Sequence, residues 1–296
     1  MMDRTDIDAV VVAQWVASAS DDELREALGG ELRTAALDEI VRRFPDYLDA
    51  ERTAGVDAVF ALRITGRADG GTDRYVVALS RGACEAARDD EREADVTLEL
   101  DAVDFVKLVS GNVNPALLAL GGRLRIDGDE RLAIALTRYF RTPAEGSARI
   151  DPTAVDSVEI ARLIEHVPES ELRKRMRGAL RELVLEEIFR RIPSYLDPRR
   201  SAGENGAIEW KITGRDNGQT DRYAVVIENG RCRAGKELRV EPRVTLRLDA
   251  AHLLKLVTGN ANPTLGFLFG KLKVKGDLAF AARLTSLFKI PSGDTT

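Results

Sequence analysis

The sequence predicts an α/β (α+β) fold class, with two tandem domains that each hold a mixed, roughly five-stranded sheet covered on one face by helices. Three observations carry this prediction. The 296 residues are a usual length for two domains. The second half repeats the first at a constant offset of 148 positions without a gap. Within each copy, runs of alternating apolar and polar residues predict half-buried strands, and they are followed by apolar residues at helical spacing.

The repeat is clearest between residues 111–129 and 259–277, where ten of nineteen positions are identical. The shared turn and cap residues are Gly111/Gly259, Asn112/Asn260, Asn114/Asn262, Pro115/Pro263, Gly122/Gly270, Gly128/Gly276 and Asp129/Asp277. Each of the two Asn-Pro pairs reads as an N-cap followed by the first helical residue. Gly111 and Gly122, with their counterparts, fit left-handed helix ends. The two aspartates are expected to cap a last helix. Each stretch thus predicts helix, turn, short helix, strand, turn and helix.

The preceding elements also recur. A short amphipathic helix is expected at the N-terminus, with Ile7, Val10, Val11 and Trp15 as its apolar set. Ser20 and Glu23 have the spacing of a capping box that opens the next helix. A further helix is expected in each copy, with apolar sets Leu37, Ile40, Val41, Phe44 and Leu185, Ile188, Phe189, Ile192. Pro45 and Pro193 are expected to end these two helices.

Three alternating strands follow in each copy. Their apolar residues are Phe60, Leu62, Ile64, then Tyr75, Val77, Leu79, then Val96, Leu98, Leu100, with Ile208, Trp210, Ile212, then Tyr223, Val225, Ile227, then Val244, Leu246, Leu248 in the second copy. The glycine-bounded segments 66–70 and 214–218 read as hairpin loops. Helices over 102–110 and 250–258, the short Pro-started helices and the last helices cover the sheets. The predicted domains are 1–148 and 149–296, each with an N-terminal helical segment, and the seam is a short polar stretch at 142–153.

Each copy contains, in order, a helix, Gly-x-x-Asn-Pro, a short apolar helix, Gly-[Lys/Arg]-Leu-x-[Ile/Val]-x-Gly-Asp and a closing helix. This order resembles the sterol carrier protein 2 (SCP2) domain. The resemblance covers residues 37–142 and 185–290, so the chain is identified as a tandem member of that family. It implies a hydrophobic tunnel between sheet and helices that holds a sterol, fatty acid, acyl-CoA or phospholipid. The implied function is non-catalytic binding of such lipids, with transfer as an extension of it.

The residues that the resemblance places at this tunnel are apolar positions of the covering helices and of one strand. They are Phe105, Leu108, Leu117, Leu118, Leu120, Leu132 and Leu136 in the first domain, and Trp210, Leu253, Leu256, Leu265, Phe267, Phe269, Phe280 and Leu284 in the second. The second tunnel gains three aromatic rings, because Ala119, Gly121 and Leu132 align with Phe267, Phe269 and Phe280. If these rings point inward, the first site is the roomier one.

Catalysis, metal binding and cofactor binding find little support in the sequence, so no enzyme activity, metal or cofactor is expected. The two histidines, His166 and His252, align with Ser18 and Asp104, so neither recurs in the other repeat, and His252 is expected to be a partly exposed structural residue. The aligned cysteines Cys84 and Cys232 give neither a disulfide framework nor a zinc pattern.

Charge and the remaining motifs bear on partners. Residues 1–150 carry 19 basic and 29 acidic side chains (net −10), whereas residues 151–296 carry 25 and 20 (net +5). The basic run 173–181 suggests a transient contact with an anionic membrane or an acidic partner, and the alternatives are an ordinary solvated helix face or a contact with the acidic first half of the chain. The repeated Thr-Asp-Arg-Tyr at 72–75 and 220–223 is interpreted as a turn that feeds a strand, with its Asp and Arg paired. Aromatic residues are not interleaved with basic ones, so nucleic acid is not expected as a partner.

The acidic N-terminus lacks the apolar core of a signal peptide, and no run of roughly 18 apolar residues occurs, so a cytoplasmic location is expected. Two alternative functions stay open. The first is an SCP2-fold interaction or scaffold module whose tunnels are filled by side chains. The second is an accessory partner of a separate enzyme that modifies steroids or acyl chains.

Overall fold

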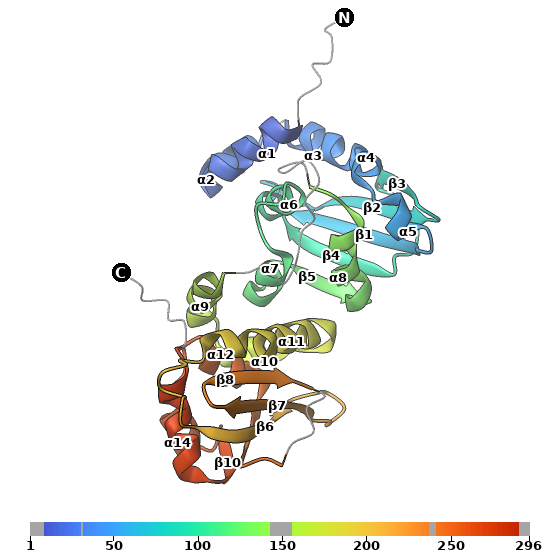
Figure 1. Cartoon of the computed structure of the whole chain (residues 1–296). Coiled ribbons are helices and arrows are strands. Elements are labelled where there is room, and N and C mark those ends of the chain that lie inside the picture. The colour runs from blue at the N-terminus through green and yellow to red at the C-terminus, as the bar shows by residue number, and fades with distance from the viewer. Residues whose placement is uncertain (1–8, 31, 143–155, 237–240, 290–296) are drawn as a thin grey trace, which may run out of the picture. The chain divides into compact units, whose positions relative to one another are not determined.

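The computed structural model describes residues 9–30, 32–142, 156–236 and 241–289. The chain divides into two compact units, Met1–Ala154 and Val155–Thr296, which are called the first and second domain (Figure 1). Apart from Thr142, the predicted seam at 142–153 lies outside the described residues.

The first domain holds one five-stranded sheet in the order β3-β2-β1-β4-β5. Its strands are β1 (Asp57–Thr65), β2 (Asp73–Ser80), β3 (Ala83–Arg88), β4 (Val96–Asp101) and β5 (Arg125–Gly128). Its helices are α1 (Ala9–Ser18), α2 (Asp21–Ala27), α3 (Leu32–Arg42), α4 (Phe44–Tyr47), α5 (Ala50–Thr53), α6 (Ala102–Val109), α7 (Pro115–Gly121) and α8 (Glu130–Tyr139).

The second domain repeats this plan, with the sheet order β10-β9-β6-β7-β8. Its strands are β6 (Asn205–Thr213), β7 (Asp221–Glu228), β8 (Arg231–Gly235), β9 (Val244–Asp249) and β10 (Lys273–Gly276). Its helices are α9 (Ser157–His166), α10 (Glu169–Arg175), α11 (Gly178–Tyr195), α12 (Ala250–Val257), α13 (Pro263–Leu268) and α14 (Leu278–Leu287).

The strand register shows that the two repeats fold alike. In each sheet the first strand pairs antiparallel with the second and parallel with the fourth, so the sheet is mixed. Phe60 lies opposite Val96 in the first domain, and Ile208 lies opposite Val244 in the second, at the same offset of 148. The predicted common strand order is therefore confirmed.

One face of each sheet is apolar and carries the helices. On β1 the side chains of Phe60, Leu62 and Ile64 are buried, and residues of α3, α6 and the other strands pack with them in one core cluster. The opposite face carries the alternate residues of the same strands. We call it the open face.

The cap signals read from the sequence match the backbone, but the expectation that Pro193 ends its helix is wrong, because α11 continues through Pro193 to Tyr195. Ser20 and Glu23 form the predicted capping box, and the side chains of Asn114 and Asn262 cap the Pro-started helices α7 and α13. Asp129 and Asp277 cap α8 and α14. These caps satisfy amides that a helix start leaves without a partner.

The first helix faces the other way from the prediction. The helix α1 forms, but Val11 and Trp15 on it are exposed, while Ala13 and Val16 are buried; Ile7 lies outside the described residues. Small and β-branched residues of α1 face the core of the domain. The prediction was wrong because it placed the largest apolar residues of the helix on its buried side.

The beginning and the end of each repeated unit are joined. A single antiparallel bridge pairs Leu48 with Phe140, and another pairs Leu196 with Phe288. The amide of Asp49 donates to the carbonyl oxygen of Tyr139 at 2.8 Å. The last helix of each domain is thereby fastened to the segment that precedes the first strand.

Candidate functional site

The apolar layer between the sheet edge and α8 of the first domain is only partly covered. Helix α8 packs on β4 and β5 (Figure 1). Its apolar residues Leu132 and Leu136 are only partly buried, as is Ile126 of β5, although all three pack against the core. A ligand that entered here would meet aliphatic side chains.

The same layer of the second domain is closed by an aromatic ring. Phe280, which aligns with Leu132, is completely buried, and the guanidinium of Arg243 lies 4.5 Å from its ring centroid. A Cβ atom at Gly206 would come within 2.9 Å of the ring, whereas the first domain has Ala58 at that position. The ring of Phe280 therefore occupies space that the methyl group of Ala58 takes in the first domain.

The predicted site residues fall into three groups. Buried are Phe105, Leu117, Leu118, Leu120, Trp210, Leu253, Phe280 and Leu284; half-buried are Leu108, Leu132, Leu136 and Leu256; exposed are Leu265, Phe267 and Phe269. The structure does not place the three exposed residues between sheet and helices. Of the three gained rings, only Phe280 points inward. Sequence spacing could not reveal this, because α13 is too short to show a helical period.

A compensating exchange of residues explains part of the difference between α7 and α13. His252 on α12 is buried, which corrects the expectation of a partly exposed side chain. Its Nε2 atom would lie 2.7 Å from a Cβ atom at Gly266. In the first domain these positions hold Asp104, which pairs with Arg123, and Leu118, which joins the core. The imidazole thus takes the place of a leucine side chain. Its Nδ1 atom lies 3.4 Å from the carboxylate of Glu169.

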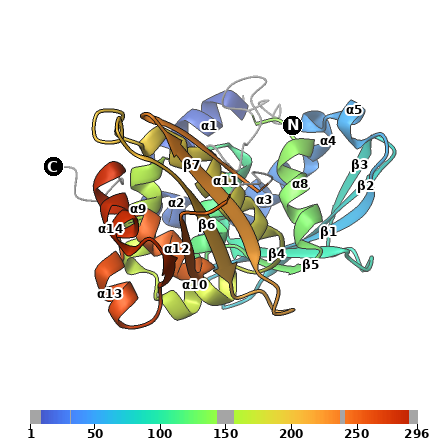
Figure 2. The same ribbon diagram turned by 60° about the horizontal axis from the view of Figure 1, so that its bottom comes forward.

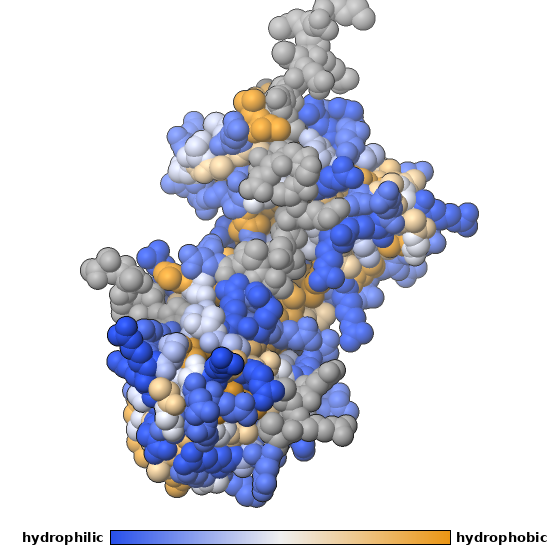
Figure 3. All heavy atoms as spheres, in the orientation of Figure 1, coloured by the Kyte–Doolittle hydropathy of each residue, from blue (hydrophilic) through white to orange (hydrophobic). Residues whose placement is uncertain are grey.

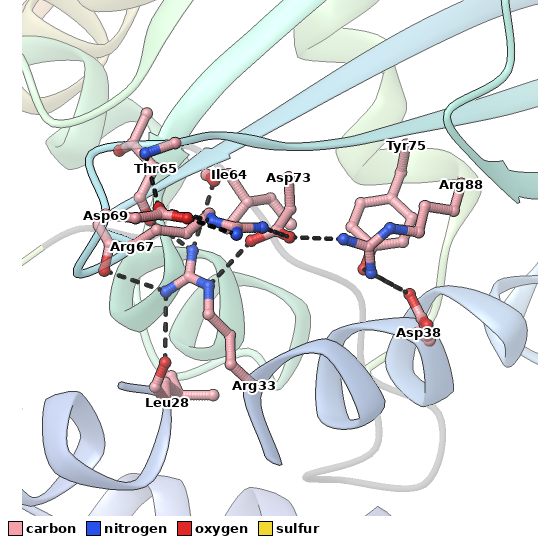
Figure 4. A network of polar contacts seen from close by, with 12 residues as sticks. Leu28, Arg33, Asp38, Ile64, Thr65, Arg67, Asp69, Asp73, Tyr75 and Arg88 are labelled. Atoms are coloured by element: carbon pink, nitrogen blue, oxygen red, sulfur yellow. Dashed lines mark hydrogen bonds and ion pairs between the residues drawn. The ribbon is translucent and has the colours of Figure 1, made fainter. Parts of the chain in front are cut away.

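A buried ion-pair network lies beside the turn between β1 and β2 in the first domain (Figure 4). Arg33 of α3 donates through Nε to Asp73 at 2.9 Å and through Nη2 to the carbonyl oxygen of Thr65 at 2.8 Å. Arg67 and Arg88 also bind the carboxylate of Asp73, at 3.1 and 2.8 Å. The side chain of Asp73 is fully buried. The network ties α3 to the β1–β2 turn.

The second domain repeats this network. Arg181 of α11 donates through Nε to Asp221 at 3.0 Å and through Nη2 to the carbonyl oxygen of Thr213 at 2.9 Å. Arg215 also donates to Asp221. The repeated Thr-Asp-Arg-Tyr segments are thus explained as structural. The expected pairing of Asp with Arg inside each segment is wrong. Neighbouring residues on a strand point to opposite faces of the sheet, so Arg74 and Arg222 are exposed on the open face.

Arg33 is the residue of this network that sequence reasoning missed. A signal was available, since Arg33 and Arg181 occupy equivalent positions of the two repeats. An arginine on a helix is normally solvated, however, and nothing local marks one whose partner is 40 positions away.

The network predicts an acid-sensitive fold. Burial acts to raise the pKa of Asp73, but the hydrogen bonds and charges of Arg33 and Arg67 outweigh it, so the pKa lies below its ordinary value of 3.8. A depressed pKa stabilises the folded state above the unfolded-state value and loses that effect as the pH falls below it. We expect Asp73→Asn to cost most above about pH 5 and progressively less below pH 4. Urea unfolding of both proteins across this range measures the difference, and a cost that did not change with pH would contradict the prediction.

The basic run 173–181 is largely neutralised within its own domain. Arg173 pairs with Glu169 and Asp249, Lys174 pairs with Glu171, and Arg181 is buried against Asp221. The run is therefore mostly an ion-paired helix face, and it offers little free charge to a membrane.

The thiols give no sign of a reactive site. Cys84 and Cys232 are free and half-buried on β3 and β8. Burial raises the pKa of each thiol to about 11, so little thiolate is present at neutral pH. Among the described residues, no group of three or more His, Cys, Asp or Glu side chains could hold a metal ion. No helix within the described ranges has both the length and the apolar character to span a membrane.

Parts of the chain are similar in sequence to known proteins. The bovine (Bos taurus) hydroxysteroid dehydrogenase-like protein 2 is 31% identical over 108 residues, which cover 36% of this chain and 25% of that protein. The chain thus spans about a quarter of the length of the curated relatives that it matches first.

Two solved structures are also similar to parts of the chain. Sterol carrier protein 2 like 2 of Aedes aegypti is 21% identical, with a TM-score of 0.29, over 36% of this chain and 94% of that one. The sec-alkylsulfatase Pisa1 from Pseudomonas sp. is 20% identical, with a TM-score of 0.33, over 39% of this chain and 18% of that one.

The decisive match is to a family model, because it recurs in both domains. The model of the SCP-2 sterol transfer family matches residues 37–141 and again residues 185–289. These two ranges run from within the third helix of each repeat to the residue that follows the bridge after its last helix, and together they span more than half of the chain. The chain therefore belongs to the SCP-2 sterol transfer family, of which it carries two domains in tandem.

Proposed function

We propose that the protein is a non-catalytic lipid-binding protein whose first domain is the main ligand site. A sterol, fatty acid, acyl-CoA or phospholipid binds between the sheet and α8 there, and transfer of the ligand between membranes is an extension of the same activity. Desolvation drives binding, at about 25 cal/mol for each Å² of apolar surface removed from water.

The observation that carries this proposal is the contrast under the last helix of the two domains. Leu132 and Leu136 cover their layer loosely, whereas Phe280, Leu284 and Leu287 on α14 are buried. A flexible aliphatic layer accepts a ligand at lower cost than a layer that a packed ring already fills. Membership of the family supports the class of ligand.

Exchanging the residues of the two domains tests the proposal. We expect Ala58→Gly with Leu132→Phe, which copies the second domain, to weaken binding of a fluorescent fatty acid by about tenfold. The reverse change, Gly206→Ala with Phe280→Leu, should add a second binding site to the full-length protein. Titration gives affinity and stoichiometry, and thermal melts check that each variant is folded.

Two outcomes would count against this site. Unchanged binding in the Ala58→Gly/Leu132→Phe variant would place the ligand elsewhere. Absence of any lipid in native mass spectra of freshly purified protein, together with no probe binding, would favour an interaction module with filled interiors.

The name of the relatives favours one variant of the proposal, in which a steroid is the ligand and the protein serves a steroid-modifying enzyme. Competition of a sterol and of an unlabelled fatty acid against the bound probe separates the two ligand classes. Displacement by the fatty acid alone would rule the steroid variant out.

A further inference from the structure

The short helix α13 of the second domain, labelled in Figure 2, exposes apolar side chains. Leu265, Phe267, Leu268 and Phe269 are between 47% and 75% exposed, and Leu278 at the start of α14 is 57% exposed. Isolated exposed apolar residues are normal, but a contiguous group with two aromatic rings marks an interaction surface. The aligned residues of the first domain include no aromatic residue, because Ala119 and Gly121 stand in place of the two rings.

The open face of the second sheet is strongly basic. Arg222, Lys211, Arg247 and Lys273 are direct cross-strand neighbours on β7, β6, β9 and β10, and they form one row across four strands. The alternation of side chains gives this face the cations Lys211, Arg222, Arg231, Arg233, Arg247, Lys273 and Lys275, against the carboxylates Glu209, Glu228 and Asp249. Hydrophilic residues cover much of the second domain in the view of Figure 3.

The carboxylates neutralise only part of this face. Glu209 lies 3.2 Å from Lys211 and 3.8 Å from Arg222, and Glu228 pairs with Arg233. Asp249 pairs with Arg173 and caps α12. Within the described part of the chain, Lys273 and Lys275 make no ion pair.

The first domain does not share this charge. Its open face carries Arg63, Arg74 and Arg125 against Asp57, Glu85, Glu99, Asp101 and Asp127. In the row itself Glu99 replaces Arg247 and pairs with Arg125. The basic face is thus a property of one repeat and not of the fold.

The apolar and basic surfaces meet at strand β10. This strand is the edge of the second sheet, and only Gly270, Lys271 and Leu272 separate it from Phe269. The amide of Leu272 donates to the carbonyl oxygen of Gly266 at 2.9 Å and holds α13 against the start of β10. Lys271, in the turn between them, pairs with Glu169 but remains half exposed.

We propose that this edge of the second domain docks on an anionic lipid membrane. Phe267, Leu268 and Phe269 enter the boundary between headgroups and acyl chains, while Lys273, Lys275 and the cation row face the anionic headgroups. Apolar anchors beside cations are the combination that interfacial binding uses, since a bilayer supplies both an apolar layer and a negative surface. Nucleic acid fits less well, because the cation row holds no aromatic residue on which a base could stack.

Sedimentation of the full-length protein with lipid vesicles tests the docking. We expect binding to vesicles of phosphatidylcholine with phosphatidylserine, little binding to phosphatidylcholine alone, and a marked loss in high salt, because salt screens surface charges. Arg222→Glu and Phe269→Ser should each weaken binding on the order of tenfold.

The first domain offers matched controls for both variants. Arg74→Glu reverses the charge at the position equivalent to Arg222, again opposite a cation of the neighbouring strand. Leu32→Ser removes an apolar side chain that is 74% exposed, close to the 75% of Phe269. Neither control should change vesicle binding, and thermal melts show that all four variants are folded.

Three results would overturn the proposal: equal binding to neutral vesicles, equal loss in variants and controls, or no loss in the two variants. Sedimentation velocity tests a second occupant of the surface. If the protein self-associates, and Phe269→Ser returns it to a monomer but leaves vesicle binding intact, the surface binds a second copy of the chain instead. None of these readouts depends on an internal ligand, so the docking and the lipid-binding site are tested separately.

Discussion

Replacing Asp73 by asparagine is expected to destabilise the first domain by about 3–5 kcal/mol, because it leaves a buried arginine without its counter-charge. The side chain of Arg33 is 6% exposed, and Asp73 is its only carboxylate partner among the described residues. The substitution keeps the shape and one acceptor oxygen, so it removes the charge with little change in packing. Thermal or urea unfolding measures the loss.

The same substitution at Asp69 is the matched control. Asp69 also pairs with Arg67, but its side chain is 60% exposed. Exposed ion pairs contribute about 0–1 kcal/mol, so Asp69→Asn should unfold almost like the wild type. Adding Arg33→Met to Asp73→Asn should restore part of the loss, because the unpaired charge is then gone. Equal effects of the two aspartate variants would show that the network does not stabilise the fold.

Alanine in place of Gly128 or Gly276 is expected to destabilise its domain by about 2 kcal/mol or more, beyond the strain of the backbone alone. Both glycines have φ near +100°, at 101° and 104°. A Cβ atom at Gly276 would lie 2.5 Å from the carbonyl oxygen of Arg243, and one at Gly128 would overlap that of Asp95. The neighbouring atoms are backbone in both cases and cannot swing away.

Two other glycines separate strain from steric overlap. Gly70 has φ of +74° with nothing within 4 Å of a Cβ atom, so Gly70→Ala should show the strain alone, about 1–2 kcal/mol. Gly55 has neither an unusual φ nor a neighbour within 4 Å, and Gly55→Ala should be neutral or slightly stabilising. Melting temperatures that failed to follow this order would mean that the turn before α8 relaxes around the added methyl group.

Local signals could be read from the sequence because their causes are local. The Asn-Pro starts of α7 and α13, the capping box at Ser20 and the strand alternation each depend on residues within a few positions of one another. Because the sequence is duplicated, each element could be predicted twice, once from each copy. The same order of signals in both copies led to the expectation that both sheets have the same strand order.

What the sequence could not reveal depends on distant partners. The direction of Phe267 and Phe280 is decided by neighbours on other elements, such as His252 under Gly266 and Gly206 beneath the ring. The buried pairing of Arg33 with Asp73 joins a helix to a strand across the core. The basic row of the second sheet emerges only when the register of four strands is known, because its members are scattered between positions 211 and 273.

The bridges from Leu48 to Phe140 and from Leu196 to Phe288 have a consequence for biosynthesis. Each domain can close only after the residue at the far side of its bridge has left the ribosome. The chain reaches Phe140 148 residues before Phe288, which at about 5–20 residues per second is a lead of roughly seven to thirty seconds. The first domain can therefore complete its fold before the strands of the second, which pair in the same order, are available, and this interval disfavours the exchange of strands between the two sheets.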